Sequence, residues 1–338
     1  MKPTVLSYHL TKYLSAYLPG VQGLSSNTIA SRRDAFALLL TFCKEIKGIP
    51  VEKVEIQTLN ARLITDFLGW LENDRKCCAS TRNQRLSSIK AFFKYLQTET
   101  PDYILQCQQV MSIPLKKSTS GNINYMTLDG IKALLDAIDI SKRNGRRDLT
   151  LISVLYDSGA RVQELADLTG GSIRLQKPET INLKGKGQKT RIVPIMEPTA
   201  RLLQQYLIEN DLVSASKRSQ PLFFNRSGNK FSRAGIAYVL KKYISLAKEV
   251  HPNLLPDVVS VHSLRHSKAM HMLQAGVPLI YIRDFLGHEE ISTTEVYAKC
   301  DGKMKRAAFE GAYTETRSTA LPIWHQDNNI LTWLKSLC

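Results

Sequence analysis

Four side chains between His262 and Tyr297 are of the types that act together on a phosphate group. His262 and Arg265 are three residues apart, so a helix would place them on one face. A guanidinium offers paired donors to a phosphate, and an imidazole such as that of His288 adds a donor or transfers a proton. A tyrosine oxygen can attack phosphorus and form a covalent intermediate. Because a free phenol has a pKa of about 10, Tyr297 would need a site that stabilises its anion.

Three short helices are predicted to position these four groups. The first should end at Gly276 and Pro278, which are typical of a helix C-terminus. The second should end near Gly287 and be buried, because apolar residues recur at helical spacing before it: Leu279, Ile282, Phe285 and Leu286. Ser292 and Glu295 form an S-x-x-E capping box, so a third helix should start there and carry the tyrosine.

Two segments upstream carry further charged residues. Arg161 and Glu164 are three residues apart, which predicts one face of a helix, and taken alone they would more simply be a surface pair. Residues Thr180–Leu183 and Thr190–Pro194 predict two strands joined by a hairpin over KGKGQK. Taken alone, the lysines of this hairpin would be solvated.

These motifs resemble those of the tyrosine recombinases, also called phage integrases. HSLRH is similar to the family's H-x-x-R box, LGH to its second histidine box, and ISTTEVY to the segment with the nucleophile. The separations also match, because His288 follows Arg265 by 288 − 265 = 23 residues and precedes Tyr297 by 297 − 288 = 9. ARVQEL is similar to the first arginine box. The chain is most similar to the Xer-like and transposon-borne integrases.

The resemblance implies a catalytic set and a mechanism. The catalytic residues would be Arg161, Lys186, His262, Arg265, His288 and Tyr297. Glu164 and His266 would support them. The arginines would bind the scissile phosphate, the tyrosine would form a 3′-phosphotyrosyl linkage, and His262 would be the candidate acceptor of the phenolic proton. Lys186, assigned by aligning the GKG pattern, would protonate the leaving oxygen, with Lys184 and Lys189 as neighbouring candidates.

The implied reaction needs no ATP, metal or other cofactor, because the phosphotyrosyl linkage conserves the bond energy. Its substrate would be double-stranded DNA with paired half-sites. Recombination of two duplexes would require a tetramer and a Holliday-junction intermediate, and accessory proteins could take part. Two alternatives remain open at this point: a type IB topoisomerase-like enzyme that relaxes one duplex, and a non-catalytic DNA-binding regulator on the same fold.

The composition favours a polyanionic partner. The net charge is +16, and the pI of about 9.6 exceeds the value of about 9 that indicates nucleic-acid binding. Charge alone would also fit an anionic membrane, but no apolar run approaches the roughly 18 residues of a membrane helix. No signal-peptide pattern is present, so a cytoplasmic, nucleoid-associated location is expected. No C-x-x-C spacing occurs, so free thiols are expected at Cys43, Cys77, Cys78, Cys107, Cys300 and Cys338.

We predict a mainly α fold with a small antiparallel β-sheet. Residues 1–110 should form an all-helical core-binding domain, which resembles the family's SAM-like domain. Residues 111–125, rich in Pro, Lys, Ser and Gly, should form a linker. Residues 126–312 should form the α+β catalytic domain. Residues 313–338 should form a tail. Its apolar helix should dock on a neighbouring subunit, with Trp333 and Leu334 as anchors, or else pack on its own subunit.

Local signals predict several helix ends. Pro19 and Gly20 should end the first helix, and Ser80 or Thr81 should cap the fourth. In the catalytic domain, Thr127 should cap a helix, and another should run from Asp148 to about Tyr156 and break at Gly159. Basic residues near helix starts and in a turn-rich segment are candidate DNA contacts, although any one of them could simply be solvated: Arg32, Arg33, Arg82, Arg85, Lys90, Arg226 and Arg233.

Overall fold

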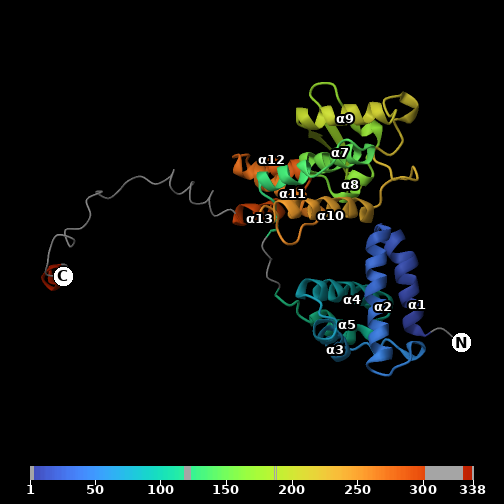
Figure 1. Cartoon of the computed structure of the whole chain (residues 1–338). Helices are drawn as coiled ribbons and strands as arrows, with labels where there is room; N and C mark the ends of the chain where they lie inside the picture. The colour runs from blue at the N-terminus through green and yellow to red at the C-terminus, as the bar shows by residue number, and fades with distance from the viewer. Residues whose placement is uncertain (1–3, 118–122, 186, 188, 301–329, 337–338) are drawn as a thin grey trace. The chain divides into compact units, whose positions relative to one another are not determined.

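The computed structural model describes residues 4–117, 123–185, 187, 189–300 and 330–336. The chain forms two compact units, Met1–Gly121 and Asn122–Cys338 (Figure 1). Both are mainly helical, and the second contains a three-stranded antiparallel sheet, which confirms the predicted fold class. Within the described ranges, no helix has the length and apolar character needed to cross a membrane.

The first unit consists of helices around one aromatic core. Phe92 packs against Phe36 and Tyr13, with ring centroids 5.0 Å and 5.3 Å away, so three elements meet at one ring. The elements are α1 (Val5–Lys12), the π-helical segment η1 (Tyr13–Val21), α2 (Ser26–Glu45), the 3₁₀ turn η2 (Val51–Lys53), α3 (Ala61–Asn73), α4 (Ala79–Glu99), the 3₁₀ turn η3 (Pro101–Tyr103) and α5 (Ile104–Ser112).

Two predicted helix boundaries in this unit differ from the observed ones by a few residues. The first helical segment was predicted to end at Pro19 and Gly20, and it continues through them as η1 to Val21. The wider winding of a π-helix accommodates a residue that lacks an N–H and would crowd a tighter turn. Helix α4 begins directly after Cys78, so Ser80 and Thr81 lie in its first turn. The Thr81 hydroxyl instead lies 3.3 Å from the Cys78 sulfur.

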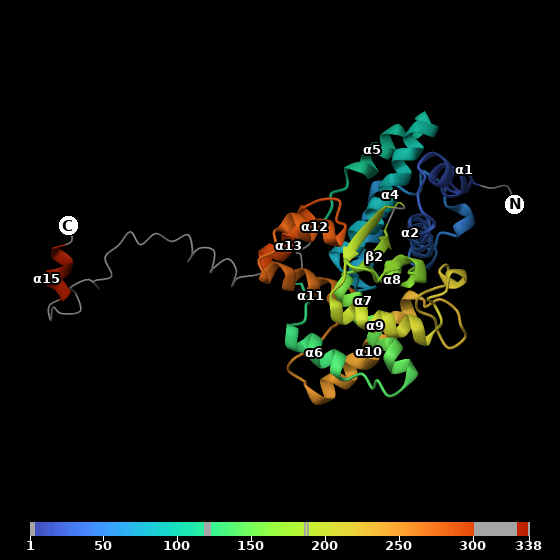
Figure 2. The ribbon, with the colours of Figure 1, turned by 90° about the horizontal axis from the view of Figure 1, so that it is seen from above.

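The second unit carries the sheet and the remaining helices (Figures 1 and 2). Its elements are α6 (Leu128–Asp136), α7 (Arg143–Ser158), α8 (Val162–Ala166), the 3₁₀ turn η4 (Gly170–Ser172), β1 (Ile173–Arg174), β2 (Thr180–Lys184), β3 (Thr190–Pro194), α9 (Glu197–Glu209), the 3₁₀ turn η6 (Ala215–Lys217), α10 (Arg233–Val250), α11 (Val261–Gln274), α12 (Leu279–Leu286), α13 (Ser292–Cys300) and α15 (Ile330–Lys335).

Local signals fix some of these ends and miss others. Thr127 caps α6 as predicted, since its Oγ1 accepts the Gly130 N–H at 3.1 Å. Helix α7 ends at the predicted break, where Gly159 adopts the left-handed conformation at φ 56°. It begins at Arg143, earlier than predicted, because its first turn is polar and lacks the apolar periodicity used to predict it.

The sheet has the order β1-β2-β3, and Leu183 on β2 pairs with Arg191 on β3. Alternation along β3 is unusual. Val193 is buried and Arg191 is half-buried, so an arginine shares the inward face of the strand. Ile192, on the other face, is 71% exposed.

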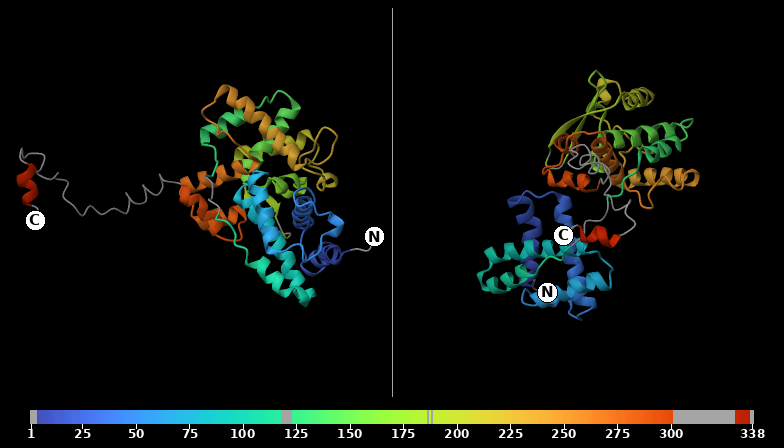
Figure 3. Two further views of the ribbon diagram at one scale, coloured as in Figure 1. Left: turned by 90° about the horizontal axis from the view of Figure 1, so that it is seen from below. Right: turned by 90° about the vertical axis from the view of Figure 1, so that its left-hand side faces the viewer.

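Helices α11, α12 and α13 pack on one another, and each begins or ends close to where the sequence predicted. The views of Figure 3 show these orange helices grouped from two further directions. Met270, Ile282, Leu286 and Tyr297 form the buried apolar cluster between them. Helix α12 ends at Gly287, which is left-handed at φ 64°.

Candidate active site

Three arginines from separate elements donate to three successive carbonyls at the C-terminus of α12. Arg191 Nε donates to Phe285 O at 3.0 Å, Arg265 Nη2 to Leu286 O at 2.6 Å, and Arg161 Nη2 to Gly287 O at 3.1 Å. The last carbonyls of a helix lack partners within the helix and carry the negative end of its dipole. They therefore suit guanidinium donors, and α12 gathers three positive charges at one point.

Glu164 is the carboxylate that the described residues place among these arginines. Its side chain is 3% exposed, and it accepts from Arg191 Nη1 and Nη2 at 2.8 Å each. It also accepts from Arg161 Nη1 at 2.9 Å and from the Arg161 backbone N–H at 2.8 Å. Burial alone would raise the pKa of Glu164, but these hydrogen bonds outweigh it and lower that pKa. Three guanidiniums and one carboxylate leave an excess of positive charge, which suits a bound anion.

Arg265 is the most deeply placed of the three arginines. It is 3% exposed, and its Nη1 donates to Gly159 O at 2.6 Å. Burial and the positive charges of Arg161 and Arg191 lower its pKa to about 10. Glu164 offsets part of this effect, and the guanidinium remains charged near neutral pH.

Tyr297 lies beside two imidazoles of the same chain. It is 2% exposed, and its Oη is 3.0 Å from His266 Nδ1. The His288 ring stacks near it, with centroids 6.5 Å apart at 11°. Burial raises the pKa of Tyr297, and Arg265 and Arg161 offset part of that effect. The phenol is therefore protonated near neutral pH and needs an acceptor for its proton.

The imidazoles are held neutral by their surroundings. Burial lowers the pKa of His288 to about 4, with further contributions from Arg265 and Arg161. Its Nδ1 lies 2.9 Å from Thr294 Oγ1, which fixes the ring. Burial, His262 and Arg265 lower the pKa of His266 as well. A neutral imidazole can accept a proton or donate one hydrogen bond.

His262 lies at the solvent-facing edge of the site, on the first turn of α11. Its ring centroid is 6.3 Å from that of His266. Partial burial, Arg265 and Arg161 lower its pKa. The sequence favoured His262 as the proton acceptor, but the imidazole within hydrogen-bond distance of the phenol is that of His266.

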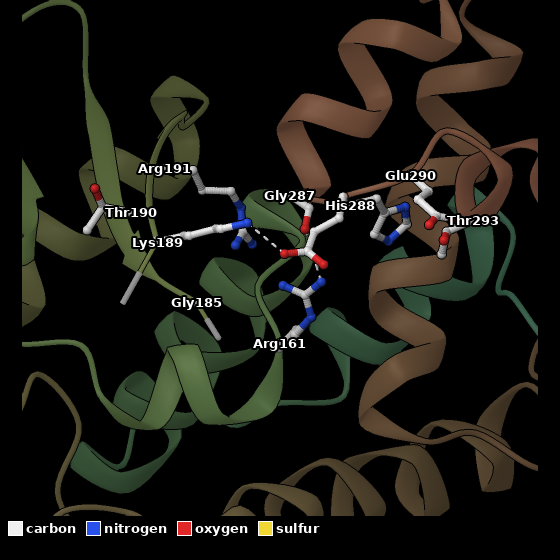
Figure 4. A pocket seen from close by; sticks show the side chains of 10 residues that line it. Arg161, Gly185, Lys189, Thr190, Arg191, Gly287, His288, Glu290 and Thr293 are labelled. Carbon is white, nitrogen blue, oxygen red and sulfur yellow. Dashed lines mark hydrogen bonds and ion pairs between the residues drawn. The ribbon is translucent and has the colours of Figure 1, made fainter. Parts of the chain in front are cut away.

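A pocket of about 640 Å³ opens in front of the arginine cluster (Figure 4). Figure 4 shows the side chains of Arg161 and Arg191 converging on the turn at Gly287. The side chain of Arg161 is 37% exposed, so it keeps donors that face the pocket. The lining residues are Arg161, Gly185, Lys189, Thr190, Arg191, Gly287, His288, Glu289, Glu290 and Thr293.

The structure places most of the predicted site residues together, with two qualifications. Arg161 is not on a helix face. It is the N-cap residue of α8, with extended backbone, and Glu164 at N3 accepts its backbone N–H. Lys186 lies outside the described residues. Its neighbour Lys189 pairs with Glu289 at 2.7 Å on the surface.

The candidate DNA contacts of the first unit differ in how firmly the protein holds them. Arg32 donates to Tyr13 Oη at 2.5 Å, and Arg85 donates to the Ser31 carbonyl at 3.3 Å. Arg82 is 12% exposed and lies 3.8 Å from Glu72. Each of these half-buried guanidiniums contacts another part of the unit, and its contact with DNA stays a prediction.

The remaining candidates are more accessible. Arg33 is exposed and pairs with its neighbour Asp34 at 2.8 Å. Lys90 is half-buried, and burial lowers its pKa. In the second unit, Arg226 and Arg233 are exposed.

The sequence prediction missed Arg191. Its contact with Glu164 joins residues 27 positions apart, and no local pattern indicates such a contact. The available signal was its position, because Arg191 lies two residues before Val193 on the strand, and residues two apart face the same side of a sheet. An inward-facing arginine requires a partner. For metals, the described ranges hold no group of three His, Cys, Asp or Glu side chains that could bind an ion.

Comparisons with known proteins found matches to both units of the chain. Residues 124–303 match the phage integrase family, and residues 10–100 match the phage integrase N-terminal SAM-like domain. A putative integrase/recombinase, y4rC, from Sinorhizobium fredii is 34% identical over 314 residues, which cover 93% of this chain and 92% of the relative. Tyrosine recombinase XerC from Syntrophus aciditrophicus is 29% identical over 315 residues, with 91% and 98% covered.

Solved structures share the fold. The Tn1549 transposon integrase in complex with transposon right end DNA has a TM-score of 0.68 at 17% identity, covering 89% of this chain and 98% of that one. The recombinase XerH bound to palindromic difH substrate has a TM-score of 0.65 at 20% identity, with 85% and 80% covered. Together with the arginine, histidine and tyrosine cluster, the matches to both domains show that the chain belongs to the phage integrase family of tyrosine-type site-specific recombinases, which cleave and rejoin DNA.

Proposed function

We propose that this chain cleaves double-stranded DNA by attack of Tyr297 on a phosphodiester and rejoins it without ATP or metal. The observation that carries the proposal is the combination of an arginine cluster with excess positive charge and a buried tyrosine of the same chain. Arg265 is adjacent on α11 to His266, whose imidazole contacts Tyr297 Oη, so a phosphate bound by Arg265 would lie near the phenol. Their charge would stabilise the transition state as negative charge builds on the phosphate oxygens.

In the proposed cleavage step, Tyr297 Oη bonds to phosphorus as the bond from phosphorus to the 5′ oxygen breaks. His266, 3.0 Å from the phenol, takes its proton. The leaving 5′ oxygen takes a proton from Lys186, which the family resemblance assigns to that role. His262 and His288 donate hydrogen bonds to the phosphate oxygens. Attack by a 5′ hydroxyl of another strand reverses these steps and releases the tyrosine.

We further propose that the substrate carries paired half-sites and that a tetramer joins two duplexes through a Holliday junction. Solved relatives support a DNA substrate, since XerH is bound to its difH substrate and a lambda integrase dimer is bound to a core site. The exposed Arg33, Arg226 and Arg233 are the candidates best placed to reach phosphates. The reaction would take place on DNA in the cytoplasm, with or without accessory proteins.

Capture of the covalent intermediate tests this function. The full chain is incubated with fragmented DNA from around its own gene in excess EDTA and denatured, and the DNA that stays attached is sequenced. We expect the attached fragments to share one sequence and the modified peptide to contain Tyr297. The Tyr297→Phe variant, which loses one oxygen and little volume, should bind the recovered site but form no adduct. An adduct that persists in this variant would contradict the assignment.

A further inference from the structure

Three of the five N–H donors of Arg191 are engaged by other groups of the protein, although Arg191 also lines the pocket. Its Nη1 and Nη2 hold the two oxygens of Glu164 at 2.8 Å each, and its Nε donates to Phe285 O at 3.0 Å. The side chain is 13% exposed, against 37% for Arg161. A planar guanidinium that forks a carboxylate fixes both the distance and the orientation of that carboxylate.

The surroundings leave little room for another arrangement. Gly287 has φ 64°, and a Cβ there would lie 3.0 Å from Arg191 Cδ and 3.1 Å from Nη1. A Cβ on Gly185 would lie 3.3 Å from Glu164 Oε1. Two glycines therefore permit the close approach of the Arg191–Glu164 pair to the turn after α12 and to the hairpin.

Glu164 transmits this constraint to Arg161. The same two oxygens accept the Arg161 backbone N–H and its Nη1. Without Arg191, and among the residues that the structure describes, the carboxylate would keep bonds to Arg161 alone and could rotate with it. With Arg191, the carboxylate is anchored to β3, and Arg161 is oriented from outside its own element.

We propose that Arg191 is a positioning residue that sets the orientation of Arg161 through Glu164, so that Arg161 meets the scissile phosphate already aligned. This rests on the proposed phosphoryl transfer at Tyr297. The competing role, a third arginine that contacts the phosphate directly, is an outcome of the test below.

The pH dependence of cleavage distinguishes positioning from a general loss of structure. The charged groups that face Glu164 among the described residues are Arg161 on its own element, Arg191 on β3 and Arg265 on α11. Burial would raise the pKa of Glu164, and Arg191 makes the largest opposing contribution. Removing the Arg191 fork therefore raises the pKa of Glu164, so the carboxylate takes up a proton at a higher pH. The cleavage rate of the variant should therefore begin to fall at a higher pH than that of the wild type; we call this fall the acid limb of the pH–rate profile.

The experiment measures single-turnover adduct formation against pH, half-site affinity and thermal melting for Arg191→Lys, Arg191→Gln and Glu164→Gln. Arg201→Lys is the matched control, because Arg201 also holds a carboxylate, that of Glu197, but is 74% exposed on α9. We expect Arg191→Lys to cleave about 10- to 100-fold more slowly, as for other residues that orient a functional group. Half-site affinity should change little, and the pH below which the cleavage rate falls should be higher than in the wild type. The control should match the wild type.

A double variant tests whether Arg191 acts through Glu164. If Arg191 acts through Glu164, Arg191→Gln combined with Glu164→Gln should cleave no more slowly than the worse single variant. An unchanged rate in Arg191→Lys, or a slower rate with no shift of the acid limb, would overturn the proposal. So would weakened half-site binding with a smaller salt dependence, which would indicate a direct phosphate contact. If the wild type itself forms no adduct, the proposed function fails rather than the role of Arg191.

Discussion

His266 Nδ1 lies 3.0 Å from Tyr297 Oη, and the two residues come from neighbouring helices of the same chain, α11 and α13. The burial that raises the pKa of Tyr297 also lowers the pKa of His266. The pair therefore consists of a protonated phenol and a neutral imidazole near pH 7, which is the starting state for proton transfer.

Removing this imidazole should slow cleavage in a pH-dependent manner. We expect His266→Ala to form adduct about a hundredfold more slowly near pH 7, within the range for a lost general base. The deficit should shrink as pH rises, because ionisation of the phenol replaces the missing acceptor. The imidazole within hydrogen-bond distance of the phenol is that of His266, so the deficit of His262→Ala should be the same at every pH. A pH-dependent deficit in His262→Ala alone would move the acceptor role to His262.

Lys186 should act on the leaving group. If it protonates the 5′ oxygen, Lys186→Ala should be slow on ordinary DNA, and a substrate with sulfur at the 5′ bridging position should restore the rate, since a thiolate leaves without a proton. Arg265→Ala should stay slow on both substrates because it lacks charge stabilisation. Rescue of Lys184→Ala or Lys189→Ala in place of Lys186→Ala would identify a neighbouring lysine as the acid.

His288 should make the folded chain sensitive to acid. Its pKa is about 4 in the folded chain, against about 6.5 for a free imidazole. Between these values the unfolded chain binds a proton that the folded chain does not, so this contribution to stability is present above pH 6.5 and is lost as pH falls toward 4.

The measurement is the melting temperature from pH 7 to pH 4. His288→Gln should flatten the fall in this interval, and the same change at the exposed His251 should not. Melting curves for His288→Gln and wild type that stay parallel across this interval would contradict the shifted pKa.

The C-terminal helix α15 (Ile330–Lys335) lies in the segment that the sequence predicted to dock on a neighbour, and Leu334 is 51% exposed on it. The side chain of Trp333, the other predicted anchor, lies outside the described residues. Truncation after Pro322 should leave half-site binding and melting nearly unchanged. It should weaken cooperative binding to the full site and strongly reduce recombination, because buried aromatic anchors dominate subunit interfaces.

Packing on its own subunit predicts a different pattern. In that case the truncated chain should melt at a lower temperature and bind a half-site less well. Gel-shift titrations on half and full sites, together with a melting curve, separate the two arrangements. Full-site cooperativity and recombination that survive truncation would exclude docking.

The sequence predicted the elements whose signals are local. The spacing before Gly287 predicted α12, and the Gly159 break ended α7 where expected. Helix α9 was not predicted, although its Leu203 and Tyr206 are buried. For Glu164, the sequence predicted a supporting role but not the partner that provides it, because β3 brings Arg191 to it from 27 positions away. The sequence also could not predict the hydrogen bonds to carbonyls of α12, because every residue has a carbonyl and the fold determines which ones accept.

The carbonyls of residues 285–287 lie in one turn, and three arginines from three different elements donate hydrogen bonds to them. His288 follows this turn directly, and its Nδ1 contacts Thr294 on α13, the helix that also carries Tyr297. The arginines that would bind the anion and the helix that carries Tyr297 are therefore both connected to the end of α12. A force that displaced the end of α12 would carry both partners of the reaction together, so their alignment would survive motions that move the site as a whole.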